Sequence, residues 1–393
     1  LYTIVPKGFF PQQDTGRIMG GVRADQSTSF QSMRGKMTQF IQIVQEDPAV
    51  DSVVGFTGGG QTNSGFMFVA LKPLAQRPGR VSSDQVIARL RPKLAKVPGA
   101  SLFLQAAQDI RVGGRQGNSQ YQYTLQSDDL NALRNWTPKL AEALRSSQKV
   151  ADVDSDQQSG GLESMITFDR ETAARLGVTT QAIDNILSDA FGQRQVAQYF
   201  TQLNSYHVIL EILPEMQGNL DSLNKLYLKS PLTGEQVPLS TFAKWTTVPV
   251  RPLSISHQGQ FPAITISFNL AQGVALGQAT EAVQKAMVDL GAPPTLSSSF
   301  QGTAQAFQQS LSTVPLLILA ALVVVYLILG ILYESYIHPI TILSTLPSAG
   351  VGALAILMAA GFDFSLIALI GIILLIGIVK KNGIMMVDFA IAA

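Results

Sequence analysis

Three apolar stretches at the C-terminal end of the chain constrain its fold most. Val314 to Leu332 and Pro339 to Gly361 contain no charged residue, and Phe364 to Val387 is apolar apart from three polar residues near its end. Each stretch approaches or exceeds the ~20 residues with which an α-helix crosses about 30 Å of hydrocarbon. The pattern predicts three membrane helices, at about 314–335, 339–361 and 364–389. The alternative, buried core helices of a soluble protein, is disfavoured because three such stretches follow one another.

Charge and cysteine content narrow the classes further. Charged residues make up 14% of the chain, against about 25% in a typical soluble domain, which agrees with a membrane portion. The formal net charge of +1 gives no basic footprint of the kind that nucleic-acid binding leaves. The absence of cysteine excludes disulfides and thiolate metal sites. The histidines, His207, His257 and His338, are far apart in the sequence, so we expect no metal site and no cofactor.

The polar region before residue 304 shows a repeated pattern of strands and helices. Its first half predicts the order β-α-β-β-α-β, with elements at 17–24, 29–47, 49–57, 65–72, 82–97 and 100–105. This order is the split βαβ pattern of a ferredoxin-like layer. A second copy is predicted in two halves, at 120–156 and 262–303, with an insert of helices and strands between them.

This interrupted repeat predicts the fold class and the domain organisation. We expect an α+β region of two ferredoxin-like subdomains with an inserted subdomain, followed by an all-α membrane segment. The expected boundaries are 14–118, then 119–164 joined with 254–303, then 165–253 for the insert, and 304–393 for the membrane helices. Residues 1–13 lack a signal-peptide pattern and are expected to be the end of a preceding membrane helix and a linker. The chain stops inside a helical pattern, so both ends predict a piece of a longer polypeptide.

Two adjacent lysines lie within the last apolar stretch. A charged lysine at the bilayer centre costs at least about 2.5–3.5 kcal/mol on insertion scales, so such residues normally face a bundle interior. On an α-helix Lys381 shares a face with Gly377 and Asp388, whereas Lys380 points about 100° away. We expect Lys381 to belong to an ion relay whose carboxylate partner lies outside this chain. The alternative is that both lysines extend to the membrane interface. Gly377 and Gly383 are expected to allow a neighbouring helix to approach closely.

Several long motifs resemble the second half of a resistance-nodulation-division (RND) multidrug efflux pump. These are PKGFFPQQD at 6–14, LYESYIHPITILSTLPSAGVGAL at 332–354 and GIVKKNGIMMVDFA at 377–390. Within that family, the stretches 20–36, 108–116 and 120–130 resemble the MdtB/MdtC branch. The resemblance implies a transporter rather than an enzyme, with the proton gradient in place of a cofactor. The chain would contain two porter subdomains, a docking subdomain at the insert, and membrane helices eight to ten.

The resemblance also implies partners and a location. Such pumps are multi-pass proteins of the bacterial inner membrane with a large periplasmic region. They export amphiphilic compounds as homo- or hetero-trimers, joined to a periplasmic adaptor protein and an outer-membrane channel. For this branch, the resemblance implies mixed trimers with an MdtB-like subunit. Alternatives left open are an RND exporter of metal ions or lipids, and a membrane-anchored periplasmic scaffold or binding module without transport.

The same resemblance assigns roles in energy coupling. Lys381 matches the relay lysine of the family, and Asn382 follows it directly as in the family motif. Asp388 is a supporting candidate one to two turns further on. The aspartates that would face Lys381 belong to a membrane helix that this chain lacks. Lys380 stands where many relatives have a small residue.

For substrate binding, the resemblance points to one loop and two strands. The loop at 55–65 matches the family's switch loop, and Gly58, Gly59 and Gly60 make it pliable. Five residues match positions of the family's drug pocket: Phe56, Phe66, Phe68, Phe103 and Gln105. At the position of Gln105, relatives carry an apolar residue. Gln105 and Ala107 predict a more polar or roomier cleft. The alternative for Phe66 and Phe68 is that their shared strand face lies in the core.

A run of alternating aspartates is the last candidate. Asp152, Asp154 and Asp156 alternate along a predicted strand and could be read as a metal cluster. A solvated strand face is the preferred interpretation, because hard-cation sites usually need more oxygen ligands around one point.

Overall fold

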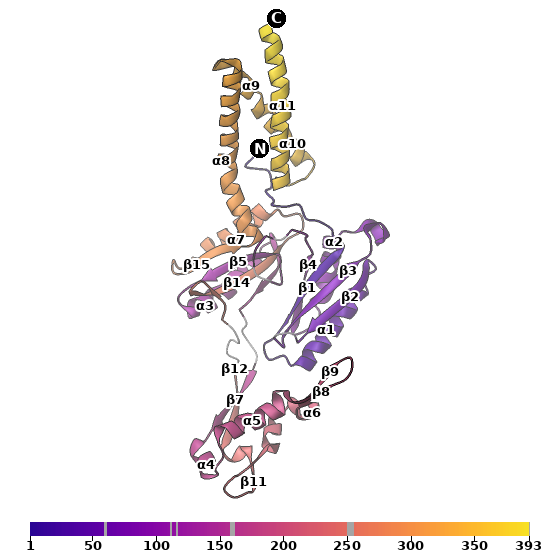
Figure 1. Ribbon diagram of the computed structural model, residues 1–393, viewed down its shortest axis with the longest axis vertical. Coiled ribbons are helices and arrows are strands. Elements are labelled where there is room, and N and C mark those ends of the chain that lie inside the picture. The colour runs from indigo at the N-terminus through magenta and orange to yellow at the C-terminus, as the bar shows by residue number, and fades with distance from the viewer. Residues whose placement is uncertain (59–60, 111, 115–116, 158–161, 250–254, 393) are drawn as a thin grey trace. The chain divides into compact units, whose positions relative to one another are not determined.

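The computed structural model describes residues 1–58, 61–110, 112–114, 117–157, 162–249 and 255–392. It divides into two compact units, one of Leu1–Ser159 with Pro252–Ala393 and the other of Gly160–Arg251. The first unit contains two antiparallel sheets with their helices, and the apolar helices at the C-terminal end (Figure 1).

The first sheet has the strand order β2-β3-β1-β4, with every neighbouring pair antiparallel. Its strands are β1 (Arg17–Ala24), β2 (Val50–Thr57), β3 (Ser64–Leu71) and β4 (Ala100–Ala106). The helices α1 (Phe30–Gln45) and α2 (Ser83–Leu94) cover one face of it (Figure 1). Two short 3-10 turns, Leu74–Gln76 and Pro78–Arg80, connect β3 to α2.

Local sequence explains where these two helices start and which side they bury. Ser29 caps α1, and Ser82 and Gln85 form a capping box that satisfies free amides at the start of α2. The buried residues of α1 recur every three to four positions, as on one helix face: Met33, Met37, Phe40 and Val44. They pack with buried strand residues such as Ile18, Val22, Met67 and Val69.

The second sheet repeats this arrangement with strands that are far apart in the sequence. In it β6 pairs with β14, β14 with β5, and β5 with β15, and a short β13 extends the edge of β14. The strands are β5 (Tyr121–Gln126), β6 (Val150–Ser155), β13 (His257–Gln258), β14 (Phe261–Leu270) and β15 (Ser297–Gln301). The helices α3 (Leu130–Arg145) and α7 (Leu276–Asp289) pack against them around a core that includes Leu125, Leu133 and Phe268.

The second unit is small and built from short elements. Its described residues, 162–249, form three two-stranded sheets, β7 with β12, β8 with β9, and β10 with β11. In chain order the elements are β7 (Leu162–Phe168), α4 (Arg170–Arg175), α5 (Thr180–Phe191), β8 (Arg194–Phe200), β9 (Ser205–Leu210), α6 (Pro214–Gln217), the 3-10 turn Leu220–Lys225, β10 (Tyr227–Lys229), β11 (Gln236–Pro238), the 3-10 turn Leu239–Thr241 and β12 (Ala243–Pro249). Ile183, Leu239 and Phe242 are at its core.

The three predicted apolar spans are present as helices long and apolar enough to cross a membrane: Thr303–Tyr333, Ile337–Ala359 and Leu366–Ala390. The first, α8 (Thr303–Tyr333), starts well before residue 314 and continues directly from the second sheet. The middle span is interrupted between α9 (Ile337–Leu343) and α10 (Leu346–Ala359). Pro347 explains the break, because proline has no amide hydrogen to donate to the carbonyl oxygen four residues back, that of Leu343, where α9 ends. The last span is α11 (Leu366–Ala392).

Candidate functional site

The exposure of residues along strand β3 shows whether its phenylalanines lie in the core or on an accessible face. Met67 and Val69 are buried under the helices, at 0% and 3% exposure. Phe66 and Phe68 alternate with them and are 45% and 46% exposed. They therefore point to the face that α1 and α2 leave uncovered, called the open face below, and the core interpretation of these two residues is wrong.

Strand pairing places all five predicted substrate residues on this open face. Phe56 lies opposite Phe66, and this row continues across β1 to Phe103 on β4. The neighbouring row runs from Phe68 across β1 to Gln105. The ring of Phe56 meets that of Phe68 edge to face, with centroids 6.2 Å apart. Phe56 is 58% exposed, so the part of the open face formed by β2 and β3 is an accessible aromatic surface.

Glutamines mark the end of the open face that is nearest β5. Gln105 is buried, and it lines a cavity of about 290 Å³ whose other glutamines are Gln108, Gln120, Gln122 and Gln301. Phe103 instead lines a second cavity, of about 580 Å³. Aromatic and amide surfaces therefore adjoin, a combination that suits compounds with an apolar body and a polar group.

The predicted switch loop is described only in part. Gly58 has a φ of +87°, a backbone conformation that favours glycine, and a side chain there would meet the ring of Phe30. Gly59 and Gly60 lie outside the described residues. At the far end of the loop, a Cβ on Gly65 would lie 2.6 Å from the carbonyl oxygen of Phe56, so this position also requires glycine.

The aspartate run does not form the solvated strand face that the sequence predicts. The side chains of Asp152 and Asp154 are only 11% and 13% exposed, and they pair with Arg91 and Arg23. Asp156 accepts a hydrogen bond from the backbone amide of Thr265 at 2.7 Å. Within the described ranges, no group of three or more His, Asp or Glu side chains could hold a metal ion.

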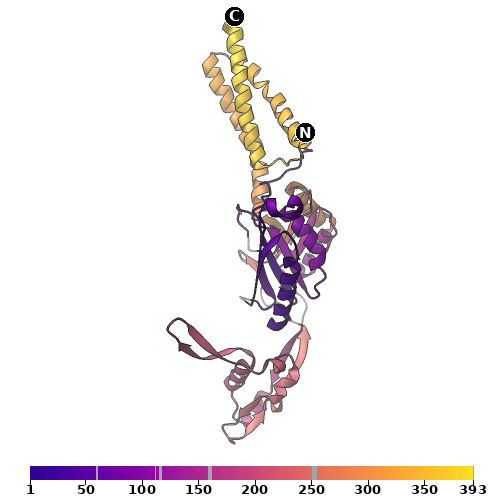
Figure 2. The same cartoon turned by 90° about the vertical axis from the view of Figure 1, so that its right-hand side faces the viewer.

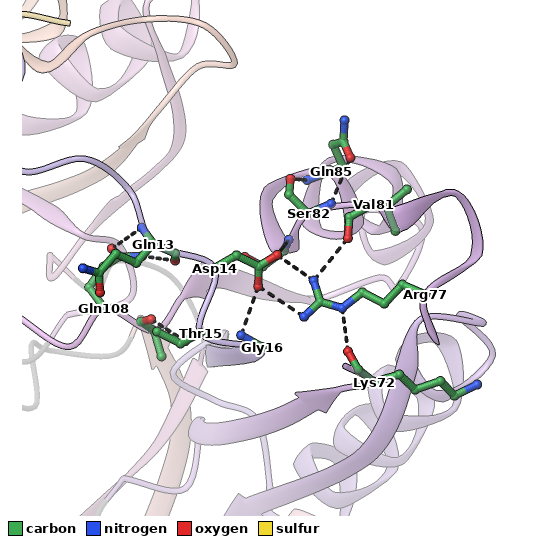
Figure 3. A network of polar contacts seen from close by, with 12 residues as sticks. Gln13, Asp14, Thr15, Gly16, Lys72, Arg77, Val81, Ser82, Gln85 and Gln108 are labelled. Atoms are coloured by element: carbon green, nitrogen blue, oxygen red, sulfur yellow. Dashed lines mark hydrogen bonds and ion pairs between the residues drawn. The ribbon is translucent and has the colours of Figure 1, made fainter. Parts of the chain in front are cut away.

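The segment 5–16, called the linker below, is anchored to the first sheet by an ion pair (Figure 3). Arg77, whose side chain is 3% exposed, donates to both carboxylate oxygens of Asp14 at 2.6 and 3.3 Å. The amides of Gly16 and Ser83 donate to the same carboxylate, each at 3.0 Å. Burial raises the pKa of Asp14, but these hydrogen bonds outweigh burial and hold that pKa below its ordinary value of 3.8.

The linker also contacts the start of the last membrane helix. The amide of Phe364, just before α11, donates to the carbonyl oxygen of Pro6 at 2.8 Å, and both views show the N-terminus next to the group of apolar helices (Figure 2). Further along, Gln13 and Gln108 exchange two hydrogen bonds, at 2.9 and 3.1 Å. The linker thus bridges the membrane helices and the end of strand β4.

On α11, the charged residues occupy different surroundings. Lys381 and Asn382 are exposed, and across the part of the chain that the structure describes Lys381 makes no ion pair. Asp388 accepts a hydrogen bond from the hydroxyl of Tyr333 at the end of α8. The structure therefore does not bring Lys381 and Asp388 together, and it gives Asp388 a partner on another helix.

The two glycines of this helix also differ. A Cβ on Gly383 would lie 3.4 Å from Ile342 of α9, so α9 and α11 approach closely there as predicted. At Gly377, no described residue lies within 4 Å of such a Cβ.

The sequence indicated the candidate aspartates but not the residues that pair with them. Arg91, Arg23 and Tyr333 pair with the candidate aspartates Asp152, Asp154 and Asp388, and each is distant from its partner in the sequence; Arg91 and Asp152, for example, are 61 positions apart. For the two arginines, the only signal was the excess of carboxylates on β6, which calls for counter-charges somewhere in the fold.

Comparison with known proteins matches the whole chain. A model of the AcrB/AcrD/AcrF family matches residues 1–393. Multidrug resistance protein MdtC of Cronobacter sakazakii is 56% identical over 393 residues, which are 100% of this chain and 38% of that protein. MdtC of Klebsiella pneumoniae subsp. pneumoniae has the same identity and coverage. The chain thus spans less than half the length of the curated relatives it matches.

Solved structures show the same fold at lower sequence identity. Two crystal forms of a heavy metal efflux pump superpose on the chain with TM-scores of 0.85 and 0.83. They are 20% identical to it, and the match covers 98% of this chain and 40% of theirs. Similarity at this identity establishes the architecture and says nothing about the cargo.

Proposed function

The chain belongs to the AcrB/AcrD/AcrF family, as its motifs predicted, and from this premise we propose that it forms part of an RND pump's inner-membrane subunit, which exports amphiphilic compounds. The observation that carries the proposal is the open face of the first sheet, where Phe56, Phe66 and Phe68 remain accessible. Exposed aromatic clusters of this kind mark binding surfaces. They accept varied apolar bodies because they impose few fixed polar contacts.

The proposed architecture follows the element order of the larger unit. Both sheets have the β-α-β-β-α-β order of a ferredoxin-like layer, with the equivalent strands in equivalent places. We assign them as two porter subdomains and Gly160–Arg251 as the docking subdomain. In this assignment the protein is multi-pass in the inner membrane with a periplasmic region. Its partners are an MdtB-like subunit in a trimer, an adaptor protein and an outer-membrane channel.

The proposed energy source is a proton gradient acting at Lys381. The side chain projects from an apolar helix, and an ammonium group there is tolerated only if an anion or water meets it. In the assembled pump, aspartates from the remaining membrane helices would supply that anion. Protonation of an aspartate would weaken its attraction to Lys381, and the resulting helix movement would be transmitted through the linker to β4.

Export of metal ions is the alternative that the sequence left open, and the solved structures with this fold, at 20% identity, establish the architecture alone. The identity of 56% to multidrug resistance proteins and the aromatic open face favour amphiphilic cargo instead. A scaffold without transport is disfavoured because it would not need a lysine within a membrane helix.

The test is export by the full-length protein with its partner subunits, in cells that lack other pumps. Accumulation of ethidium, a cationic amphiphile, reports activity. Lys381→Ala is expected to abolish export, whereas Lys380→Ala, its neighbour about 100° around the helix, should retain most of it. If the two variants export ethidium equally well at equal protein levels, Lys381 is not part of a proton relay.

A second arm tests the cargo. Phe56→Ala and Phe103→Ala should each change which dyes and detergents are exported, because each removes part of the open face. A profile identical to that of the unaltered protein would rule out contact between these residues and the cargo.

A further inference from the structure

The two sheet subdomains of the larger unit meet along a seam with little apolar packing. Buried apolar residues around the first sheet form one cluster, and those around the second sheet form another. Cavities of about 290, 200 and 580 Å³ lie along the seam, each lined by residues from both sides. Polar interfaces between domains permit relative motion, whereas large apolar ones resist it. The side chains that cross the seam therefore decide how firmly it stays closed.

The first crossing joins helix α2 to strand β6. Arg91 donates two hydrogen bonds to the carboxylate of Asp152, at 2.7 and 2.6 Å. Asp152 also accepts a hydrogen bond from the side-chain amide of Asn269 at 3.0 Å. The same amide donates to the carbonyl oxygen of Leu104 at 3.3 Å, so Asn269 contacts both subdomains as well. Two parallel hydrogen bonds give this pair a defined geometry that a single contact would lack.

The second crossing joins strand β1 to strand β6. Arg23 lies 3.2 Å from a carboxylate oxygen of Asp154 and donates a hydrogen bond to the backbone carbonyl of Ser155. Asn118 donates to Asp154 at 2.7 Å. A Cβ on Gly21 would lie 2.1 Å from the side-chain oxygen of Asn118, so only glycine lets this loop approach the open face.

Strand β6 is bent where its aspartates face the first subdomain. Asp152 has a φ of +51°, and the pairing of β6 with β14 shifts register between Ser267 and Asn269. Irregularities of this kind re-aim side chains.

We propose that Arg91–Asp152 and Arg23–Asp154 form a two-point ionic clasp that holds the seam closed and sets how readily the open face is reached. Arg23, Asp154 and Phe103 line the same cavity of about 580 Å³, so release of the clasp widens access to a residue of the open face. The proposal rests on the proposed function, because it regulates access to that same site. Opening requires that the two ion pairs separate, together with the hydrogen bonds from Arg23 to Ser155 and from Asn269 to Leu104.

The test measures access to Phe103 directly, without transport. In the full-length protein in membrane vesicles, Phe103→Cys as the only thiol is labelled with a maleimide. Adding Asp152→Asn and Asp154→Asn removes both charges at nearly constant size, and asparagine tolerates a positive φ. Labelling should accelerate by about threefold to tenfold, as expected for the loss of two partly exposed ion pairs. Asp189→Asn is the matched control, because it removes a partly exposed ion pair with Arg194 in the second unit and should leave the rate unchanged.

Charge exchange and salt complete the test. Arg23→Asp and Asp154→Arg should each accelerate labelling, and the two together should bring it back towards the starting rate. An unchanged rate in the double asparagine variant, or no recovery in the exchanged pair, would overturn the clasp. If these variants fail to fold, the single variant Phe103→Cys is labelled at about 0.1 and 1 M salt. The screening length shortens from about 10 to 3 Å, so labelling must accelerate at the higher salt concentration. A flat salt profile would count against the clasp. If these labelling rates change as expected but the unaltered protein does not export ethidium, the proposed function is wrong and the clasp is not.

Discussion

The two sheets of the larger unit share their strand order but differ in the face that their helices leave uncovered. On the first sheet that face presents Phe66 and Phe68 in an exposed state. On the second sheet the equivalent face is polar and buried, with Thr124 and Thr265 hydrogen-bonded to each other at 3.0 Å. One topology therefore carries an exposed aromatic face in one copy and a buried polar face in the other. The difference lies in a few alternating side chains, which is why fold alone does not assign function.

The largest expected difference comes from truncating two neighbouring side chains of strand β3, one on each face of the first sheet. Met67→Ala removes a side chain that is 0% exposed, so we expect it to cost about 2–5 kcal/mol of local stability. Phe66→Ala, on the open face, should cost less than about 1 kcal/mol. Hydrogen exchange of β3 amides in the full-length protein measures both. Equal losses would contradict the assignment of the two faces.

The anchor of the first sheet should give the next largest effect, and it should depend on pH. Asp14→Asn weakens the hydrogen bonds to Arg77, and we expect a loss of about 2 kcal/mol at neutral pH. Because the pKa of Asp14 is lower in the folded state than its ordinary 3.8, its contribution is fully present above pH 3.8. That contribution is lost as the pH falls through the lower, folded-state pKa.

Hydrogen exchange of β1 and of the 72–83 loop as a function of pH measures this effect. The difference between Asp14→Asn and the unaltered protein should shrink at acid pH, while the second sheet shows no difference at any pH. A difference that is independent of pH would mean that the charge of Asp14 contributes nothing.

The buried polar face of the second sheet predicts a smaller loss of stability, in which the single variants cost more than the double variant. Thr124→Val leaves the hydroxyl of Thr265 buried without its partner, and we expect a cost of about 1–3 kcal/mol. Changing both threonines to valine should be nearly neutral, because two apolar groups of the same shape then face each other. Hydrogen exchange of β5 and β14 tests this. A double variant that loses as much as the sum of the single ones would show that the pair is not isolated.

Local patterns were enough to predict most of the elements but not their contacts. The alternation in 65–72 and the helix periodicity in 29–47 depend on neighbouring residues, so the strand and helix could be located from sequence. Alternation shows that β3 has two faces, but only the position of α1 and α2 shows that Met67 is the buried one. The middle membrane span was predicted without its break, although Pro347 was visible in the sequence.

Residues of the candidate site divide in the same way. The phenylalanines were found through the resemblance to the family's drug pocket, whereas strand alternation indicated only that Phe66 and Phe68 share one face. The partners of Asp152 and Asp154 come from another subdomain, and no local pattern specifies which arginine crosses the seam. Lys381 stands out by its cost in a membrane helix, but its anionic partner is not supplied by the described residues.

The most direct test of the account is whether cargo covers the open face of the first sheet. In the full-length protein with no other thiol, Phe68→Cys should react readily with a maleimide, and ethidium should slow that reaction in proportion to its occupancy. Val69→Cys, one residue along and 3% exposed, should be unreactive with or without the dye. Labelling of Phe68→Cys that proceeds at the same rate under saturating ethidium, in protein that still exports it, would contradict the account.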